Sequence, residues 1–187
     1  MLKMIKTLIT EMNILFVFIV RAWPVSPIGQ KLRQWYWSRK VAGRKPVFQR
    51  MSNITDHQLA TIGDNISVGE YVVIDPNNSK GIYIGSNVFL AIRTYIRGAN
   101  HQFSSLERLI KDQGHRADSI QYQGREYSIV IEDDVWIGAN AIILSGSMIG
   151  TGCVIGAGCI IDSEIPPYSI VQGNDASRIV RKRENRV

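Results

Sequence analysis

The chain has 187 residues, of which 45% are hydrophobic and 20% are charged. This length and composition fit one folded domain with an appendage, and they exclude a largely disordered chain. The net charge of +6 is unevenly spread: residues 1–60 carry ten Lys/Arg against two Asp/Glu, and residues 61–177 carry seven against thirteen. A basic flank of this kind often meets an anionic partner, such as a membrane lipid, a nucleic acid or a phosphorylated ligand.

Residues 1–24 predict an amphipathic helix. Apolar side chains recur at helical spacing on one face, namely Ile5, Leu8, Ile9, Met12, Leu15, Phe16, Ile19 and Trp23. The unbroken apolar run from Ile14 to Val20 is far shorter than the roughly 20 residues that span a bilayer, and Glu11 interrupts a signal-peptide pattern. Two interpretations stay open: a helix on a membrane surface and a helix packed against the protein's own body.

Residues 31–40, KLRQWYWSRK, follow the helix-breaking residues Pro24, Pro27 and Gly29. Aromatic residues flanked by basic ones suit a membrane interface, but they could equally cover the open end of a repeat domain. No nucleic-acid recognition motif accompanies them, so we expect no nucleic-acid partner. We expect residues 1–55 to form a helical extension, with peripheral membrane contact through residues 1–45. The predicted location is cytoplasmic, with the inner face of the membrane as the surface contacted.

An isoleucine stands at every sixth position of the stretch from 131 to 165. The series is Ile131, Ile137, Ile143, Ile149, Ile155 and Ile161. A period of six is neither the 3.6 of a helix nor the alternation of a strand, and it is typical of a β-helix built from hexapeptides. Three hexapeptides make one coil of about 18 residues, with the isoleucines pointing inward. Cys153 and Cys159 stand at the fifth place of their repeats, where we expect small buried side chains.

Earlier repeats run from Ile62 to His101, with a four-residue insertion at about 78–81. The two blocks together predict an all-β solenoid, a parallel β-helix of about four coils, over residues 56–177. Residues 41–60 look like a loose lead-in, and residues 178–187 form a basic tail. Between the blocks lies an excursion over residues 101–128. A long loop that interrupts a repeat array usually carries function.

Three runs resemble the left-handed β-helix acyltransferases with hexapeptide repeats. They are VWIGA at 135–139, IGAG at 155–158 and IPPYSIVQGN at 165–174. The resemblance covers about residues 62–183 and is strongest to the galactoside, maltose and colanic-acid acetyltransferase branch. It implies a left-handed solenoid, acetyl-CoA as co-substrate, a saccharide hydroxyl as acceptor, and a homotrimer with active sites between subunits. The basic, aromatic N-terminal segment also resembles members from capsule and O-antigen pathways, which suggests surface polysaccharide biosynthesis.

Acetyl transfer to an alcohol needs a base, and histidine has a suitable pKa. His101 ends the first block of repeats, at a fixed point beside the excursion, and it matches the catalytic histidine of the family. His115 in the excursion is the weaker candidate, and we interpret His57 as a structural or surface residue. The resemblance implies that the Ala139 backbone amide donates to the oxyanion that develops during transfer.

The other site residues follow mainly from the same resemblance. Along stacked corners of the solenoid, residues expected to contact the CoA arm are Trp136, Ala139, Ser145 and Ala157. The family usually has Asn-Pro-Ala-Lys where this chain has Asn-Asp-Ala-Ser at 174–177. The CoA phosphates are therefore assigned to the tail residues Arg178, Arg181 and Lys182. Saccharide contacts are assigned to Asp75, Asn77, Arg93 and Arg97, although Asp75 also fits an ordinary repeat position.

Two alternatives remain open, and a third is disfavoured. The first is an N-acyltransferase that acts on an amino sugar nucleotide with the same base. The second is a β-helix scaffold without enzymatic activity. The third, a zinc enzyme on the same fold, needs histidines at metal-ligand spacing, and no pair four or five residues apart is present. We therefore predict no metal site.

Overall fold

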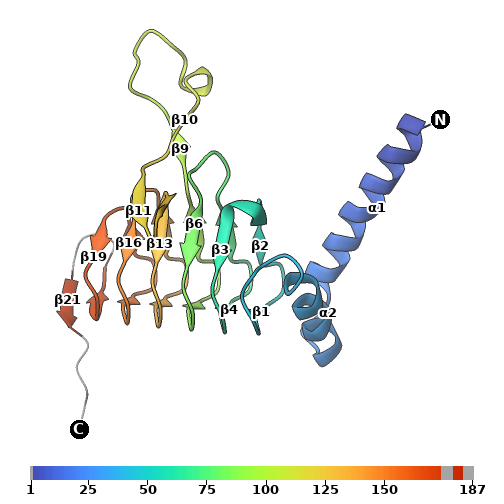
Figure 1. The fold of residues 1–187 in the computed structure, drawn as a ribbon, viewed down its shortest axis with the longest axis horizontal. Coiled ribbons are helices and arrows are strands. Elements are labelled where there is room, and N and C mark those ends of the chain that lie inside the picture. Colours follow the sequence, from blue (N-terminus) through green and yellow to red (C-terminus); the bar gives the residue numbers. More distant parts are fainter. Residues whose placement is uncertain (1, 174–178, 183–187) are drawn as a thin grey trace.

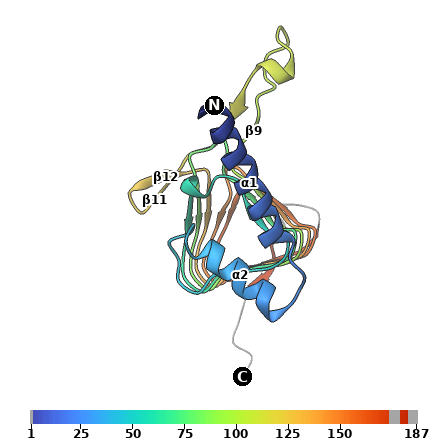
Figure 2. The ribbon, with the colours of Figure 1, turned by 90° about the vertical axis from the view of Figure 1, so that its right-hand side faces the viewer.

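The structure is a computed structural model that describes residues 2–173 and 179–182, with side chains described for residues 6–173. Two helices, α1 (Leu2–Ala22) and α2 (Pro27–Trp37), precede a stack of short strands. Seen from the side, the strands follow one another along a straight prism (Figure 1). Seen along its length, the coils superimpose as a triangle (Figure 2).

Three sheets form the faces of this prism. The first face has the order β1-β4-β7-β14-β17-β20-β21, the second β18-β15-β8-β5-β2 and the third β19-β16-β13-β6-β3. The first face contains β1 (Val47–Phe48), β4 (Ser67–Val68), β7 (Phe89–Leu90), β14 (Trp136–Ile137), β17 (Val154–Ile155), β20 (Ser169–Val171) and β21 (Ile179–Lys182). The second contains β2 (Asn53–Ile54), β5 (Val73–Asp75), β8 (Tyr95–Arg97), β15 (Ile142–Leu144) and β18 (Ile160–Ile161). The third contains β3 (Ala60–Ile62), β6 (Ile82–Ile84), β13 (Ile129–Ile131), β16 (Met148–Ile149) and β19 (Glu164–Ile165).

The isoleucine series lies inside the prism, as predicted. All six members are fully buried, and they pair with their equivalents in neighbouring coils, as in Ile131 with Ile149 and Ile137 with Ile155. Cys153 and Cys159 are buried and are not joined in a disulfide, and burial raises the pKa of Cys159 above its ordinary value. The all-β solenoid, a left-handed β-helix, is thereby confirmed.

Glycine at the second repeat position has a packing role. A Cβ on Gly138 would lie 2.6 Å from the backbone nitrogen of Ala157 in the next coil. The positive φ that turns each corner falls two residues further on, for example at Asn140 (φ 57°) and Gly146 (φ 92°). Small residues at the second position therefore let consecutive coils approach, while Asn, Asp or Gly at the fourth position makes the turn.

The β-helix starts earlier than the sequence analysis predicts. Strand β1 pairs with β4, β2 with β5 and β3 with β6, all in parallel. Residues 47–62 are therefore a complete first coil, and the expected loose lead-in over residues 41–60 is wrong. Within the described residues the prism has five complete coils, against the predicted four or so, followed by β20 and the antiparallel β21.

Helix α2 caps the open end of the first coil. Trp37 is buried and stacks on Phe48 of β1, with ring centroids 4.6 Å apart. The buried guanidinium of Arg33 donates to the carbonyl oxygens of Phe48 (3.2 Å) and Trp23 (2.8 Å). These contacts confirm, for Trp37, the end cap that was one of the two roles considered for the aromatic segment. Such a cap covers the strand edge that the first coil would otherwise expose.

Helix α1 extends away from the prism beyond this cap (Figures 1 and 2). Its C-terminal end is tied to the first coil: Val20 is buried, and Arg21 donates from Nε to the carbonyl oxygen of Ser52 at 3.1 Å. Packing of the whole helix against the body, one of the two interpretations of this segment, is therefore wrong. Across residues 2–173 and 179–182, no helix combines the length and apolar character needed to cross a membrane.

The excursion leaves the prism in the third coil, between β8 on the second face and β13 on the third. It contains β9 (Asn100–His101), the short 3₁₀ helix η2 (Ile110–Asp112), β10 (His115–Arg116), β11 (Ile120–Tyr122) and β12 (Arg125–Tyr127). Strands β9 and β10 form an antiparallel pair, as do β11 and β12. Tyr122 and Tyr127 of the second pair pack on Tyr83 of β6, with centroids 4.9 and 5.6 Å away. One part of the excursion thus lies on the third face and the other projects from it.

Candidate active site

His101 stands where the chain leaves the prism at the corner between its second and third faces. It pairs in register with His115 across the β9–β10 ladder. The two imidazole rings lie 4.7 Å apart at an interplanar angle of 32°. Gln102 continues the ladder by donating from its backbone nitrogen to the carbonyl oxygen of Gly114 at 3.0 Å. His115, the weaker sequence candidate, is therefore the immediate neighbour of His101.

An open groove of about 540 Å³ runs beside His101. Residues from the excursion form one wall and residues from the corners of the fourth and fifth coils form the other. Its lining comprises Asn100, His101, Phe103, Arg116, Asp118, Ser119, Ile120, Leu144, Ser145, Gly146 and Asp162. Both His101 and Phe103 are exposed to it. The groove thus combines an accessible imidazole with an apolar ring, a cation and two carboxylates, groups able to bind a polar molecule.

Two buried serines fix the base of the excursion to the prism. The backbone N–H of Asp118 donates to Oγ of Ser145 at 2.7 Å, and Oγ of Ser128 donates to the carbonyl oxygen of Asp118 at 2.8 Å. Ser145 is only 5% exposed, and its hydroxyl is used to hold the excursion at Asp118. These contacts set the position of the groove wall that faces His101. The sequence analysis overlooked Asp118 and Ser128, because their importance comes from contacts between segments far apart in the chain.

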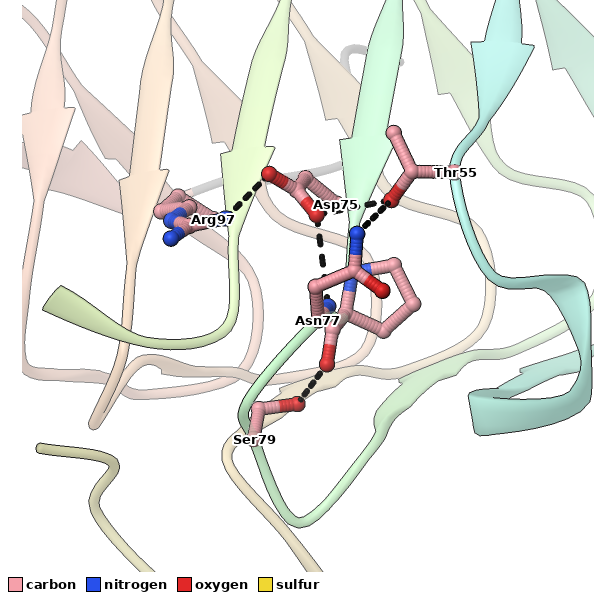
Figure 3. Close-up of polar contacts among 6 residues, drawn as sticks. Thr55, Asp75, Asn77, Ser79 and Arg97 are labelled. Carbon is pink, nitrogen blue, oxygen red and sulfur yellow. Dashed lines mark hydrogen bonds and ion pairs between the residues drawn. The ribbon is translucent and has the colours of Figure 1, made fainter. Parts of the chain in front are cut away.

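Asp75 and Arg97, both predicted to bind a saccharide, form an ion pair with each other (Figure 3). Burial alone would raise the pKa of Asp75, but hydrogen bonds from the Thr55 hydroxyl (2.7 Å) and the Asn77 backbone amide (3.2 Å), together with Arg97, hold that pKa below its ordinary value. Asn77 also donates from its side-chain amide to Thr55 at 3.0 Å. The network ties the insertion after β5 to the second face.

The ion pair lies next to the groove. Arg97 pairs in register with Leu144 of β15, and Leu144 lines the groove. Arg93 lies elsewhere, at the corner between the first and second faces. There its backbone N–H donates to the backbone carbonyl oxygen of Glu70. Arg97 therefore remains within the neighbourhood of His101, whereas the structure separates Arg93 from it. Saccharide binding by all four residues stays a prediction.

Ala139 and Ala157 occupy the same corner on successive coils. The N–H of Gly158 donates to the carbonyl oxygen of Ala139 at 2.9 Å, and Ile137 pairs with Ile155. Ser145 lies at the opposite end of β15, so the expected stacking of Ser145 with these two alanines is wrong. Six residues of separation correspond to one face of the prism, and eighteen to one coil. Trp136, half exposed on β14, belongs to the first face.

Within one chain, Ala139 and His101 therefore lie at different corners. Strand β15 runs from the corner of Ala139 to the corner of Ser145, which lies beside His101. Ala139 is itself half-buried at this corner.

Of the remaining predicted residues, the structure describes the side chain of His57 alone, and it falls outside the groove. His57 lies in the 3₁₀ helix η1 (His57–Leu59) of the first coil, in agreement with a structural or surface role. Arg178 lies outside the described residues, as do the side chains of Arg181 and Lys182, whose backbone forms part of β21. Among the described residues, no three His, Cys, Asp or Glu side chains gather as a metal-binding group.

Comparison with known proteins agrees with this architecture. Residues 128–163 match the family model described as bacterial transferase hexapeptide (six repeats). Over 122 residues, 65% of the chain, it is 34% identical to "Probable acetyltransferase Rv3034c" of Mycobacterium tuberculosis. Over 51 residues, 27% of the chain, it is 51% identical to the 2,3,4,5-tetrahydropyridine-2,6-dicarboxylate N-acetyltransferase of Ligilactobacillus salivarius. These matches span only 37% and 22% of the relatives' own lengths.

Two solved structures share the fold at low sequence identity. The hexapeptide-repeat acetyltransferase VCA0836 of Vibrio cholerae, complexed with acetyl coenzyme A, superimposes with a TM-score of 0.71 at 24% identity, covering 90% of this chain and 84% of that one. A maltose O-acetyltransferase from Clostridium difficile gives 0.67 at 22% identity, covering 89% and 82%. Residues 128–163 thus carry the repeats of the matched family model, and the chain as a whole shares the three-sheeted fold of these two acetyltransferases.

Proposed function

We propose that the protein is an acetyl-CoA-dependent O-acetyltransferase that acts on a saccharide hydroxyl, with His101 as general base. The observation that carries this proposal is the exposed imidazole of His101 at the margin of an open, polar groove on a hexapeptide β-helix. Support for the co-substrate comes from the V. cholerae protein complexed with acetyl coenzyme A, and support for the acceptor from the maltose O-acetyltransferase of the same fold. The capsule or O-antigen type of polysaccharide is the acceptor class we favour.

In this proposal, His101 accepts the proton of the acceptor hydroxyl as its oxygen bonds to the acetyl carbon. Bound acetyl-CoA supplies the thioester that is cleaved. The Ala139 amide donates to the developing oxyanion, and His101 returns its proton to the departing sulfur, so that protons balance. Trp136 and Ala157, on the same side of the prism as Ala139, would contact the CoA arm. The phosphates would meet the basic tail, including Arg178.

His115 serves as a positioning residue in this scheme. Its ring lies 4.7 Å from that of His101, and the β9–β10 ladder holds both. Because a phenylalanine ring fills similar space without titrating near neutral pH, His115→Phe keeps the ring contact and removes any proton transfer. We expect His115→Phe to retain most of the activity. If His115→Phe instead loses as much activity as His101→Ala, the two histidines act together as the base.

The proposal requires a homotrimer in which one subunit contributes His101 and its neighbour contributes the Ala139 corner. The support is the separation of the two positions within one chain by strand β15. A mixture of His101→Ala and Ala139→Pro subunits tests it, because proline removes the N–H at 139. We expect mixed oligomers to regain activity that neither variant has alone. If light scattering gives a monomer that is fully active, the shared site is excluded.

The experiment that tests the acceptor is a screen of saccharides and amino sugar nucleotides, with release of CoA from acetyl-CoA as the signal. Hydroxylamine at alkaline pH cleaves an O-acetyl ester and leaves an N-acetyl amide intact, so the product class is read directly. We expect a hydroxylamine-sensitive product from a saccharide. A resistant product from an amino sugar nucleotide would establish the N-acyltransferase alternative, and no CoA release with any acceptor would favour a scaffold.

A further inference from the structure

Helix α1 carries an apolar stripe that continues to Trp23 and that the described part of the chain leaves largely exposed. Its members fall on one side of the helix and are each between 40% and 63% exposed, namely Leu8, Ile9, Met12, Leu15, Phe16, Ile19 and Trp23. The opposite side carries Lys6, Thr10 and Asn13 in the first half of the helix, and the apolar Ile14 and Phe18, 58% and 56% exposed, in the second half. A helix of this kind has the amphipathic form that lies in the plane of a membrane surface.

The stripe cannot be buried by the prism in this arrangement. The C-terminal end of α1 is fixed to the first coil through Arg21, and the rest of the helix points away from it (Figure 1). Phe16 reaches Trp35 of α2 at a centroid distance of 6.5 Å, edge to face. Trp35 is itself 47% exposed. The stripe therefore continues onto an aromatic residue of α2 and remains open to a partner.

Basic residues surround the exposed Trp35. Lys31, Arg39 and Lys45 line a shallow groove with it, and the guanidinium carbon of Arg39 lies 4.2 Å from the centre of the Trp35 ring. Residues 1–45 contain nine Lys/Arg against the single acidic residue Glu11. Tryptophan next to cations suits the headgroup depth of a bilayer, where anionic lipids attract each basic residue. A second copy of residues 1–45 is a poorer partner than a bilayer, because it would place its own positive charges next to these.

We propose that the apolar stripe of α1 and the basic groove around Trp35 form one docking surface for an anionic lipid bilayer. The stripe enters the boundary between headgroups and acyl chains, and Lys31, Arg39 and Lys45 contact the lipid phosphates. Val25, 75% exposed between the helices, and Ile28, 65% exposed in the first turn of α2, extend the apolar part. Because α2 caps the first coil, the β-helix is held close to the membrane. This surface is independent of the activity proposed for His101.

Flotation of the full-length protein with vesicles tests this surface. The vesicles contain phosphatidylcholine alone, or phosphatidylcholine with about one third phosphatidylglycerol. We expect the protein to float with the anionic vesicles, and the bound fraction to fall as salt rises, because salt screens charge. The double variant Leu15→Glu/Ile19→Glu should lower the partition coefficient at least about tenfold. Lys31→Glu/Arg39→Glu should remove the preference for phosphatidylglycerol by a similar factor.

A matched control comes from the excursion. Leu106 and Leu109 are 101% and 66% exposed but lie away from the basic segment and outside the groove lining. Leu106→Glu/Leu109→Glu should bind vesicles like the wild type. The proposal is overturned if the wild type fails to float with anionic vesicles at low salt, or if the stripe variant floats equally well. It is also overturned if the stripe variant changes the oligomeric mass and leaves flotation unchanged, since the stripe would then be a subunit contact.

Discussion

The coils at 131–165 and helix α1 are both rich in branched apolar residues, yet they use them in opposite ways. In the coils, every isoleucine of the six-residue series is fully buried. In α1, Leu8, Leu15 and Ile19 are 61%, 58% and 43% exposed. The difference arises from the backbone: each coil stacks on its neighbours and covers their interior side chains, whereas a lone projecting helix has no layer to cover it. Apolar composition alone therefore does not identify a core.

The largest stability difference between the two regions should come from truncating one apolar side chain in each. Ile143 is fully buried on β15, so Ile143→Ala should lower the free energy of unfolding by about 2–5 kcal/mol. Leu15→Ala on the exposed stripe should change it by less than about 0.5 kcal/mol. Urea unfolding followed by circular dichroism measures both. Equal losses for the two variants would mean that α1 is buried in solution and would remove the contrast.

A second prediction concerns how closely the coils stack. Because a methyl group on Gly138 would meet the backbone nitrogen of Ala157 at 2.6 Å, Gly138→Ala should push two coils apart. The expected cost is about 1–3 kcal/mol, typical of an overpacked interior. Thermal unfolding of the variant should show a lower Tm. An unchanged Tm would indicate that the coils can separate locally without loss of stability.

A third stability prediction concerns the pH-dependent contribution of Asp75. Its pKa is lowered in the folded chain, so its stabilising contribution is present above the ordinary carboxyl pKa and is lost as pH falls through the lowered value. Asp75→Asn should therefore cost about 1–3 kcal/mol at pH 7, and the difference from wild type should shrink below about pH 4. Urea unfolding across this pH range measures the difference.

Asp64→Asn is the control, because the Asp64–Arg44 pair is largely exposed. Its removal should change stability little at any pH, since solvent weakens an exposed ion pair. A constant difference between Asp75→Asn and wild type from pH 7 to pH 3 would contradict the assignment of charge to Asp75 in the network of Figure 3.

The solenoid was predictable because its interior follows a fixed period. The first coil was overlooked, although Phe48 and Ile54 are also six residues apart, because the small residue that follows most isoleucines later in the chain is replaced by Gln49 and Thr55. The six-residue period also predicts that Ser145 and Ala139 lie at different corners, because residues six apart lie on successive faces of the prism. Counting faces, in addition to repeats, recovers both features from sequence.

The groove was only partly predictable. His101 stood out because it ends a block of repeats, and that position is visible in the sequence. Its contact with His115 was not, because it depends on the register of the β9–β10 ladder across a loop. Asp118 and Ser128 become recognisable only through their hydrogen bonds with each other and with Ser145. Loop register and side-chain contacts across the chain have no period, so sequence alone gives no signal for them.

The account rests on His101 as the base of an acetyl transfer. The most direct measurement is the initial rate of CoA release from acetyl-CoA, with a productive acceptor, in His101→Ala and His57→Ala, each shown to unfold at the wild-type Tm. His57 lies in the first coil, away from the groove, so its loss should leave the rate within about twofold of wild type. His101→Ala should lower the rate by about 10²–10⁴-fold. A wild-type rate in His101→Ala would contradict the proposed mechanism.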